Sequence, residues 1–371
     1  MKKNIAIFIH SFGKGGAEKV ASTLVDSFNK TNSVILVLLR DEIVCALPKG
    51  VEKVVLKGGI FQKIFAYKKL CEAKNIDISL SFLTLPNLIA IGSKIIGNKA
   101  KIFISEHTVQ SIWRRDERVF YAIKFLIISI FYRFADKTIT VSKKIAQDLV
   151  KNFFCNEKKI ITIYNPFDIE AIIKKSQEEA KDIAFDKKIT FISIGTLYKV
   201  KNFPLIISSF AEIKEKNSQL LILGEGEDLE ELKKLVQELN LQNRVYLLGF
   251  QTNPYKYLAK SDIFVLGSNQ EGLPNVIIEA LACGCAVVST DCTAGPREIL
   301  APKSDFDKKI KNEIELAEFG ILTPVGMEER MIEALNAMIE KKESYRSKAL
   351  IRAIDFSLKN GIDKYKREMD V

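Results

Sequence analysis

Short apolar runs alternate with longer amphipathic stretches along this chain, and this alternation limits the fold more than any other feature. In the first half, each run is rich in β-branched or aromatic residues and is followed by a polar or small residue. Nearly continuous hydrophobicity indicates strands buried on both faces, so we expect a parallel sheet covered by helices, one of them at residues 17–28. These runs occupy residues 5–9, 34–39, 78–82, 102–105 and 138–141.

The same rhythm starts again in the second half. It breaks at residues 165–168, and residues 169–188 are charged and helical in character, so we place a domain junction there. A second doubly wound domain is expected because 371 residues exceed what one hydrophobic core usually supports. Charged residues 302–318 predict an exposed excursion, and residues 351–371 predict a closing helix. The later apolar runs occupy residues 189–194, 219–223, 245–248, 263–266 and 286–289, with helical stretches such as residues 229–239 between them.

Charge is unevenly distributed between the two halves. Residues 1–170 carry 27 Lys and Arg against 15 Asp and Glu, whereas the remainder carries 29 against 31. This asymmetry favours an anionic partner of the first half, such as a lipid headgroup or a diphosphate, over nucleic acid. No apolar stretch reaches the roughly 20 residues of a membrane span, and the first residues do not resemble a signal peptide, so we expect a cytoplasmic protein.

The segment at residues 110–128 places aromatic residues beside cations. Trp113 and Phe120 neighbour four basic residues, and this composition suits a helix lying in a bilayer interface. A core helix with a solvated basic edge is the alternative. The four cations are Arg114, Arg115, Arg118 and Lys124. The six cysteines and two histidines show neither zinc-ligand spacing nor a disulfide framework, so no metal site is expected.

Ligands of open parallel sheets bind beyond the carboxyl ends of the strands, so the residues that follow each run are candidates. After the first run, Gly15 and Gly16 let the backbone approach phosphate or sugar oxygens, although a simple turn also favours glycine. Glu18 occupies the last glycine position of a dinucleotide fingerprint and excludes that motif. After the run at 102–105, His107 is placed to donate to a sugar hydroxyl or a diphosphate, unless it is an ordinary surface histidine.

The strongest pattern lies at residues 267–284. Pro274 suits the first position of a helix whose positive end would face a diphosphate. Glu279 shares a face of that helix with Asn275 and lies among apolar residues, so it either accepts hydrogen bonds from ribose hydroxyls or satisfies a backbone group or a lysine. Glu271 would face the sugar. Lys201 would bring a cation to the leaving diphosphate, unless it is a solvated loop lysine.

Together these motifs give the chain a specific resemblance. Glu271 and Glu279 form an E-x7-E pair, and the sequence resembles the retaining glycosyltransferases of family 4, which have the GT-B fold. Within that family it is similar to the N-acetylgalactosaminyltransferases of bacterial lipid-linked oligosaccharide and protein N-glycosylation pathways. The other motifs that carry the resemblance are Gly15-Gly16-Ala17-Glu18, Ser105-Glu106-His107, Tyr164-Asn165-Pro166, Leu223-Gly224-Glu225-Gly226, Ser261-Asp262-Ile263-Phe264 and Gly295-Pro296-Arg297-Glu298.

The resemblance implies two facing Rossmann-like domains. Residues 1–167 would bind the acceptor, residues 168–355 would bind the nucleotide sugar, and a helix at residues 356–371 would pack back on the first domain. Catalysis would depend on His107, Glu271 and Lys201, without a metal. Thr196 stands where the family often has an arginine, which puts one diphosphate contact in doubt. The expected substrate-binding residues are Gly15, Gly16, Thr196, Lys201, Glu225, Leu273, Pro274, Asn275 and Glu279.

The reaction expected on this basis is transfer of a sugar from a UDP-sugar to a polyprenyl-diphosphate-linked oligosaccharide. The donor of first choice is UDP-GalNAc, the product is α-linked, and the site of action is the inner face of the cell membrane, where the protein would be peripheral. Alternatives are a glycosyltransferase of lipopolysaccharide or capsule assembly that uses another UDP-hexose, a nucleotide-sugar epimerase on the same fold, and a non-catalytic nucleotide-sugar sensor.

Overall fold

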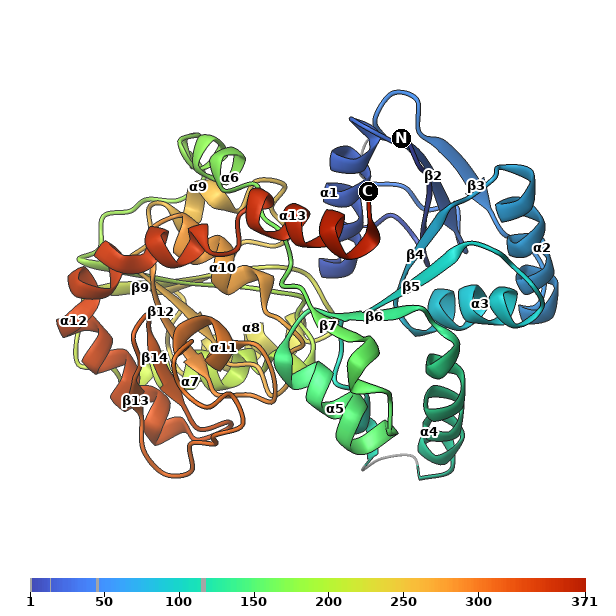
Figure 1. Cartoon of the computed structure of the whole chain (residues 1–371). Helices are drawn as coiled ribbons and strands as arrows, with labels where there is room; N and C mark the ends of the chain where they lie inside the picture. The colour runs from blue at the N-terminus through green and yellow to red at the C-terminus, as the bar shows by residue number, and fades with distance from the viewer. Residues whose placement is uncertain (1, 14, 45–46, 115–117) are drawn as a thin grey trace. The chain divides into compact units, whose positions relative to one another are not determined.

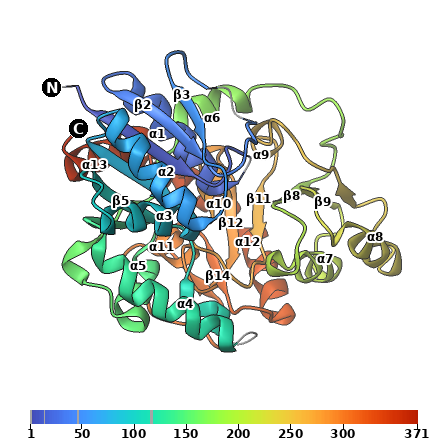
Figure 2. The ribbon, with the colours of Figure 1, turned by 90° about the vertical axis from the view of Figure 1, so that its right-hand side faces the viewer.

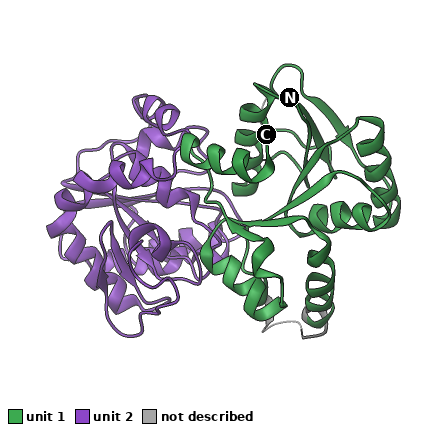
Figure 3. Ribbon diagram, viewed as in Figure 1, with its two compact units in different colours: residues 1–167, 358–371 green, residues 168–357 purple. Residues whose placement is uncertain are grey.

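The computed structural model describes residues 2–13, 15–44, 47–114 and 118–371, without the side chains of residues 113–121. The chain divides into two compact units (Figure 3). Unit 1 comprises residues 1–167 and 358–371, and unit 2 comprises residues 168–357. Each unit is a sheet of mainly parallel strands with helices on both faces, as Figures 1 and 2 show.

The sheet of unit 1 has the strand order β3-β2-β1-β4-β5-β6-β7 among the described residues, and neighbouring strands pair in parallel. The five strands predicted from apolar runs are present, with ends shifted by at most one residue. The two edge strands, β3 and β7, were not predicted because they are short and only partly buried. The strands are β1 (Asn4–Ile9), β2 (Ser33–Leu38), β3 (Glu52–Val55), β4 (Ile78–Phe82), β5 (Lys101–Glu106), β6 (Lys137–Thr140) and β7 (Ile160–Thr162).

Helices cover the two faces of this sheet separately. One buried cluster joins α1 and α13 to the sheet, and another joins α2, α3, α4 and α5 to its opposite face. Alternate strand residues supply the two clusters, as the pleat of a β-strand requires. The helices are α1 (Gly16–Asn29), α2 (Ile60–Ala73), α3 (Thr84–Ile95), α4 (Arg118–Phe131), α5 (Lys143–Phe153) and α13 (Leu358–Met369), with short 3-10 helices η1 (Gln110–Arg114), η2 (Tyr132–Phe134) and η3 (Glu157–Lys159).

Helix α13 joins unit 1 although it follows unit 2 in sequence. It buries Ile362, Tyr365 and Met369 in the same cluster as α1. An ion pair of 2.7 Å between Lys137 Nζ and Glu368 Oε2 ties the helix to β6. The single closing helix predicted at residues 351–371 is wrong in one respect, because the chain turns at residues 355–357 between two helices. Phe356, expected in the returning helix, therefore belongs to unit 2.

The sheet of unit 2 has the order β10-β9-β8-β11-β12-β14-β13 among the described residues. All pairs are parallel except that of β13 with β14. The five predicted strands are again present, whereas β13 and β14 were not predicted. The strands are β8 (Ile189–Ile194), β9 (Ser218–Leu223), β10 (Val245–Leu247), β11 (Ile263–Leu266), β12 (Ala286–Thr290), β13 (Glu315–Leu316) and β14 (Ile321–Thr323).

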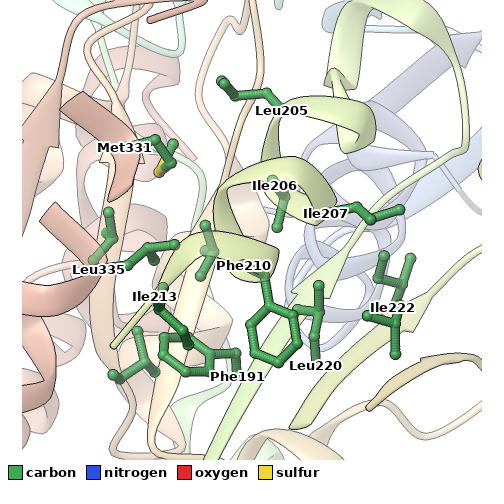
Figure 4. Packing of buried hydrophobic residues seen from close by; sticks show 14 of the residues in the cluster. Phe191, Leu205, Ile206, Ile207, Phe210, Ile213, Leu220, Ile222, Met331 and Leu335 are labelled. Carbon is green, nitrogen blue, oxygen red and sulfur yellow. The ribbon is translucent and has the colours of Figure 1, made fainter. Parts of the chain in front are cut away.

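One large hydrophobic cluster fixes a face of this second sheet. Phe191, Phe210 and Leu220 pack with side chains from α7 and α12 (Figure 4). Burial of these apolar side chains, at about 25 cal/mol per Å² removed from water, dominates the stability of the layer. The helices of unit 2 are α6 (Ile169–Ser176), η4 (Lys199–Lys201), α7 (Phe203–Glu212), α8 (Leu229–Glu238), α9 (Tyr255–Leu258), α10 (Asn275–Ala282), α11 (Pro296–Leu300) and α12 (Glu328–Ile354).

Three local predictions for unit 2 need correction. The helix expected at residues 169–188 ends at Ser176, because the charged residues after it lack an apolar face that could pack. The helix expected to begin at Pro274 begins at Asn275, and Pro274 precedes it with a non-helical ψ of 94°. The excursion at residues 302–318 is not wholly solvated, because it includes β13 and a carboxylate, Glu315, that pairs with a buried arginine.

Candidate active site

The carboxyl edge of the second sheet contains its topological switch point. Strand β8 lies between β9 and β11, so the chain direction around the sheet reverses there. Open α/β sheets bind ligands in the crevice that such a reversal leaves beyond the strand ends. The loops that follow β8 and β11 carry Lys201 and Glu271, and the structure brings these two side chains together.

Lys201 and Glu271 form an ion pair of 2.6 Å between Nζ and Oε1. Ser268 adds a second donor, because its hydroxyl lies 2.7 Å from the same carboxylate oxygen. The Lys201 side chain is 25% exposed and that of Glu271 is 9% exposed, so the cation remains accessible while the carboxylate is largely covered. The carboxylate therefore fixes the position of a partly exposed ammonium group at the switch point.

Glycine residues allow the loops after β8 and β9 to pack directly against each other. A Cβ on Gly224, whose φ is 148°, would lie 1.8 Å from the carbonyl oxygen of Gly195. The amide of Leu197 donates to the carbonyl of Glu225 at 2.9 Å. This backbone pairing leaves the side chains of Thr196 and Glu225 exposed at the same edge.

The loop before α10 packs against the loop that follows β12. Gly295, at φ 91°, lies so close that a Cβ there would be 2.3 Å from Cδ of Pro274 and 3.0 Å from Cα of Leu273. Leu273 and Pro274 are buried, whereas Asn275 at the first turn is only partly covered. The loop at residues 291–296 therefore holds the start of α10 in place.

Glu279 lies on α10 and is only 2% exposed. The hydroxyl of Tyr255, from α9, lies 3.4 Å from its Oε1. Burial and the neighbouring Glu279 carboxylate raise the pKa of Tyr255, so this tyrosine stays protonated and presents a donor. The sequence suggested ribose hydroxyls, a backbone group or a lysine as partners of Glu279. The structure adds a partner that the sequence did not suggest, the hydroxyl of Tyr255.

In unit 1, His107 follows β5 at the carboxyl edge. Its Nε2 lies 3.0 Å from the hydroxyl of Ser105, and its ring lies 5.6 Å, between centroids, from that of Phe82. Burial lowers the pKa of His107 to about 4, so the imidazole is neutral near pH 7. A neutral imidazole keeps one donor and one acceptor nitrogen. It is partly buried rather than an ordinary surface histidine.

Glu106, directly before His107, fixes the start of the loop after β5 through its hydrogen bonds. Its carboxylate is 1% exposed and accepts hydrogen bonds from Asn87 at 3.0 Å and Gln110 at 2.6 Å, together with one from the Tyr132 hydroxyl. Burial raises the pKa of Glu106, and these donors oppose that shift. Glu106 belongs to the Ser105-Glu106-His107 motif, but no role was predicted for it from the sequence. An acidic residue at the end of an apolar run could have indicated a buried hydrogen-bond acceptor.

The remaining candidates of unit 1 are only partly defined. Gly15 and Gly16 lie where β1 passes into α1, at the same sheet edge as His107. Arg115 lies outside the described residues, and the side chains of Arg114 and Arg118 do as well. Lys124 is partly buried; burial lowers its pKa, and the charges of Glu106 and Asp148 oppose that effect.

Comparison with known proteins gives these features a family. Residues 14–171 match the family model described as Glycosyltransferase Family 4, and residues 174–349 match that of Glycosyl transferases group 1. The chain is 38% identical, over 95% of its length and 96% of the relative, to the N-acetylgalactosamine-N,N'-diacetylbacillosaminyl-diphospho-undecaprenol 4-alpha-N-acetylgalactosaminyltransferase of Campylobacter jejuni. The chain is a family 4 glycosyltransferase.

A second enzyme and a solved structure are also similar to this chain. Another Campylobacter jejuni enzyme, GalNAc-alpha-(1->4)-GalNAc-alpha-(1->3)-diNAcBac-PP-undecaprenol alpha-1,4-N-acetyl-D-galactosaminyltransferase, is 26% identical, with 81% of this glycosyltransferase and 83% of the relative covered. The crystal structure of Anabaena HepE in complex with UDP superposes with a TM-score of 0.82 over both whole chains, at 17% identity. The GT-B fold expected from the sequence is therefore confirmed.

Sequence reasoning missed a buried ion cluster beside the candidate donor loop of the glycosyltransferase. Arg297 of α11 is 3% exposed and pairs with Asp291 at 2.7 Å and with Glu315 of β13 at 3.1 Å. Burial opposes the charge on Arg297, but its bonds to the two carboxylates prevail and raise its pKa. Asp291 and Arg297 thus close the 291–296 loop that supports Pro274. The Gly295-Pro296-Arg297-Glu298 motif was the available signal.

The described residues of this glycosyltransferase contain no group of three or more His, Cys, Asp or Glu side chains arranged to hold a metal ion. Within the same residues, no helix combines the length and the apolar character needed to cross a bilayer.

Proposed function

We propose that this glycosyltransferase transfers N-acetylgalactosamine from UDP-GalNAc, with retention of the anomeric configuration, to a polyprenyl-diphosphate-linked oligosaccharide at the cytoplasmic face of a membrane. The Lys201–Glu271 pair at the switch point of unit 2 carries the proposal, because it supplies a cation where a departing diphosphate needs one. The activities for which the two Campylobacter jejuni relatives are named support the donor sugar and the lipid-linked acceptor. The UDP in HepE supports a uridine nucleotide.

In the proposed reaction, the bond between the sugar C1 and the UDP β-phosphate oxygen breaks, and its electron pair leaves with UDP. The acceptor hydroxyl oxygen bonds to C1 on the same face, and its proton passes to the departing phosphate oxygen. Lys201 and the positive end of the α10 dipole stabilise the developing negative charge without a resident metal. We assign Glu271 to the transferred sugar and His107 to a hydrogen bond with a sugar or diphosphate oxygen.

Contacts to the nucleotide are assigned to the loops of unit 2. Glu279 would accept hydrogen bonds from the ribose hydroxyls, and Thr196, Glu225, Leu273, Pro274 and Asn275 would line the donor. In unit 1, Gly15 and Gly16 would approach the substrate through backbone amides. The net positive charge of residues 1–170 supports the assignment of the diphosphate-bearing acceptor to unit 1.

Measurement of UDP release in EDTA tests the proposed function. UDP-GalNAc, UDP-GlcNAc and UDP-Gal are each offered with and without a polyprenyl-diphosphate glycan. We expect release from UDP-GalNAc only when the lipid is present, with a matching mass gain in the lipid. Release with another sugar would identify a different hexosyltransferase, loss of activity in EDTA would contradict metal independence, and an isomerised sugar formed without lipid would identify an epimerase.

Replacing Glu279 with glutamine tests the ribose assignment. Hydrogen bonds to charged groups contribute about 1.5–3 kcal/mol, so we expect KM for the donor to rise roughly ten- to hundredfold with a smaller change in kcat. Steady-state kinetics with UDP-GalNAc as the varied substrate measure this. Glu238→Gln, the same change at an exposed position of α8, is the control. An unchanged donor KM in the Glu279 variant would remove this residue from the nucleotide site.

Apolar side chains on α4 support the proposed membrane contact. Ile123, Leu126 and Ile130 are 55%, 57% and 45% exposed, and they recur at helical spacing while Ile128 faces the core. We expect Leu126→Asp to weaken sedimentation with anionic liposomes at low salt by about tenfold or more, since a buried leucine contributes about 1.5–3 kcal/mol. Leu350→Asp, at a 40% exposed position of α12, is the matched control. Equal sedimentation of both variants with the wild type would rule out this surface.

A further inference from the structure

The hydroxyl of Ser268 lies beside the Lys201–Glu271 ion pair of the candidate site. Ser268 is fully buried, and its hydroxyl donates to Oε1 of Glu271 at 2.7 Å. The direction of this hydrogen bond is fixed, because the carboxylate partner of an ammonium group only accepts. The same Oε1 atom pairs with the Lys201 ammonium group at 2.6 Å. One oxygen of the carboxylate therefore has two donors, which come from two different loops.

The other oxygen of this carboxylate is left for a ligand. An ionised carboxylate has about four acceptor sites, two on each oxygen, so Ser268 and Lys201 together occupy those of Oε1. Within the described part of the chain, Oε2 of Glu271 accepts no hydrogen bond, and the Glu271 side chain is 9% exposed. A substrate hydroxyl that donates to Glu271 therefore meets Oε2.

The backbone that carries Ser268 is held by two neighbouring elements. Thr290, the last residue of β12, is fully buried and donates its hydroxyl to the Ser268 carbonyl oxygen at 2.6 Å. On the other side, the amide of Asn269 donates to the carbonyl oxygen of Val200, in η4, at 2.8 Å. The Ser268 hydroxyl is thus a donor in a fixed position, although it belongs to a loop.

We propose that Ser268 and Thr290 are positioning residues that hold the Glu271 carboxylate with Oε1 against Lys201 and Oε2 toward the transferred sugar. The Ser268 hydroxyl orients the carboxylate, and the Thr290 hydroxyl fixes the peptide that carries Ser268. The orientation of the ion pair is a property of the resting protein, whereas the contact with the sugar rests on the function proposed above.

Acetylation of Lys201 tests the orientation of the ion pair in the resting protein. Acetic anhydride needs the nitrogen lone pair, so an ammonium group held by a carboxylate reacts more slowly than a free one. Mass spectrometry gives the rate at Lys201 relative to that at Lys199, which is exposed on the same η4. We expect Ser268→Ala and Thr290→Val to raise this ratio about threefold or more, towards its value in Glu271→Ala.

Two variants are the controls for this measurement. Thr290→Ser keeps the hydroxyl that Thr290→Val removes, and Ser209→Ala changes another fully buried serine of unit 2, on α7. Both should leave the ratio unchanged. An unchanged ratio in Ser268→Ala would overturn the inference, and an unchanged ratio in Thr290→Val would overturn the role of Thr290. If Ser268→Ala fails to fold, the comparison of the two Thr290 variants still decides.

Transfer kinetics test the contact with the sugar. We expect Ser268→Ala to lower kcat/KM for UDP-GalNAc about tenfold or more, with the Kd of UDP unchanged, because only the orientation of the carboxylate is lost. In a Glu271→Ala background, Ser268→Ala should have no further effect, since Ser268 acts through that carboxylate. A loss that persists in this background, or weaker binding of UDP, would indicate a general structural role and overturn the inference.

The two measurements separate the inference from the function on which part of it rests. If the wild type transfers no sugar in the UDP-release assay, the proposed function fails, while the acetylation ratio still decides how the ion pair is held. If the wild type transfers the sugar but Ser268→Ala changes neither the acetylation ratio nor kcat/KM, the proposed function stands and the inference fails.

Discussion

Alanine at position 201 should lower the turnover number for transfer about 10²- to 10³-fold, because the departing diphosphate loses a positioned cation. The Lys201 ammonium is 2.6 Å from Glu271 and remains partly exposed at the switch point of unit 2. Without the ammonium group, the Glu271 carboxylate loses its ion pair and keeps the hydrogen bond from the Ser268 hydroxyl. Measurement of kcat at saturating donor and acceptor gives the size of the effect.

Lys199→Ala is the matched control for this prediction, since Lys199 begins the same short helix η4 and is exposed. We expect that variant to keep kcat within about threefold of the wild type, because water and salt screen the interaction of an exposed charge with the diphosphate. Near-normal turnover in Lys201→Ala would remove the lysine from the reaction. A comparable loss in both variants would assign the effect to η4 as a whole.

Methionine in place of Arg297 should lower the free energy of unfolding of unit 2 by about 3–5 kcal/mol, the usual effect of removing one partner of a buried ion pair. Methionine has similar length but leaves the buried Asp291 carboxylate and the partly buried Glu315 without their shared cation. Urea unfolding of the full chain, followed by a probe in unit 2, measures the loss.

The same substitution at Arg330 provides the comparison. Arg330 pairs with Glu333 one turn along α12, and the two side chains are 35% and 45% exposed. We expect Arg330→Met to change the free energy of unfolding by only about 0.3–0.5 kcal/mol. If Arg297→Met were equally mild, the cluster of Arg297, Asp291 and Glu315 could not be what holds the 291–296 loop.

The sequence predicted the interior of the fold better than its margins. Ten apolar runs became strands of the two sheets, because strands buried on both faces must be apolar throughout. The edge strands β3 and β7 escaped prediction, since an edge strand is partly solvated and carries a weaker pattern. Residues 177–188 looked helical from their charged composition, yet they have no apolar face to pack.

The candidate site divides in the same way. That Lys201 and Glu271 lie at one sheet edge follows from their places after β8 and β11, so their shared location was predictable from the order of the strands. Their direct contact depends on side-chain conformations across 70 residues of sequence. The pair Asp291–Arg297 could not be predicted, because nothing in a single sequence indicates which buried polar groups meet.

The return of α13 to unit 1 also fixes an order of events during synthesis. Residues 168–357 must be translated between the two parts of unit 1, and at about 5–20 residues per second this takes roughly ten to forty seconds. During that interval the nascent first unit lacks Ile362, Tyr365 and Met369 and exposes the apolar residues that they cover. A ribosome that stalls in unit 2 therefore presents a hydrophobic surface of the kind that chaperones and proteases bind, and only a chain translated as far as α13 conceals it.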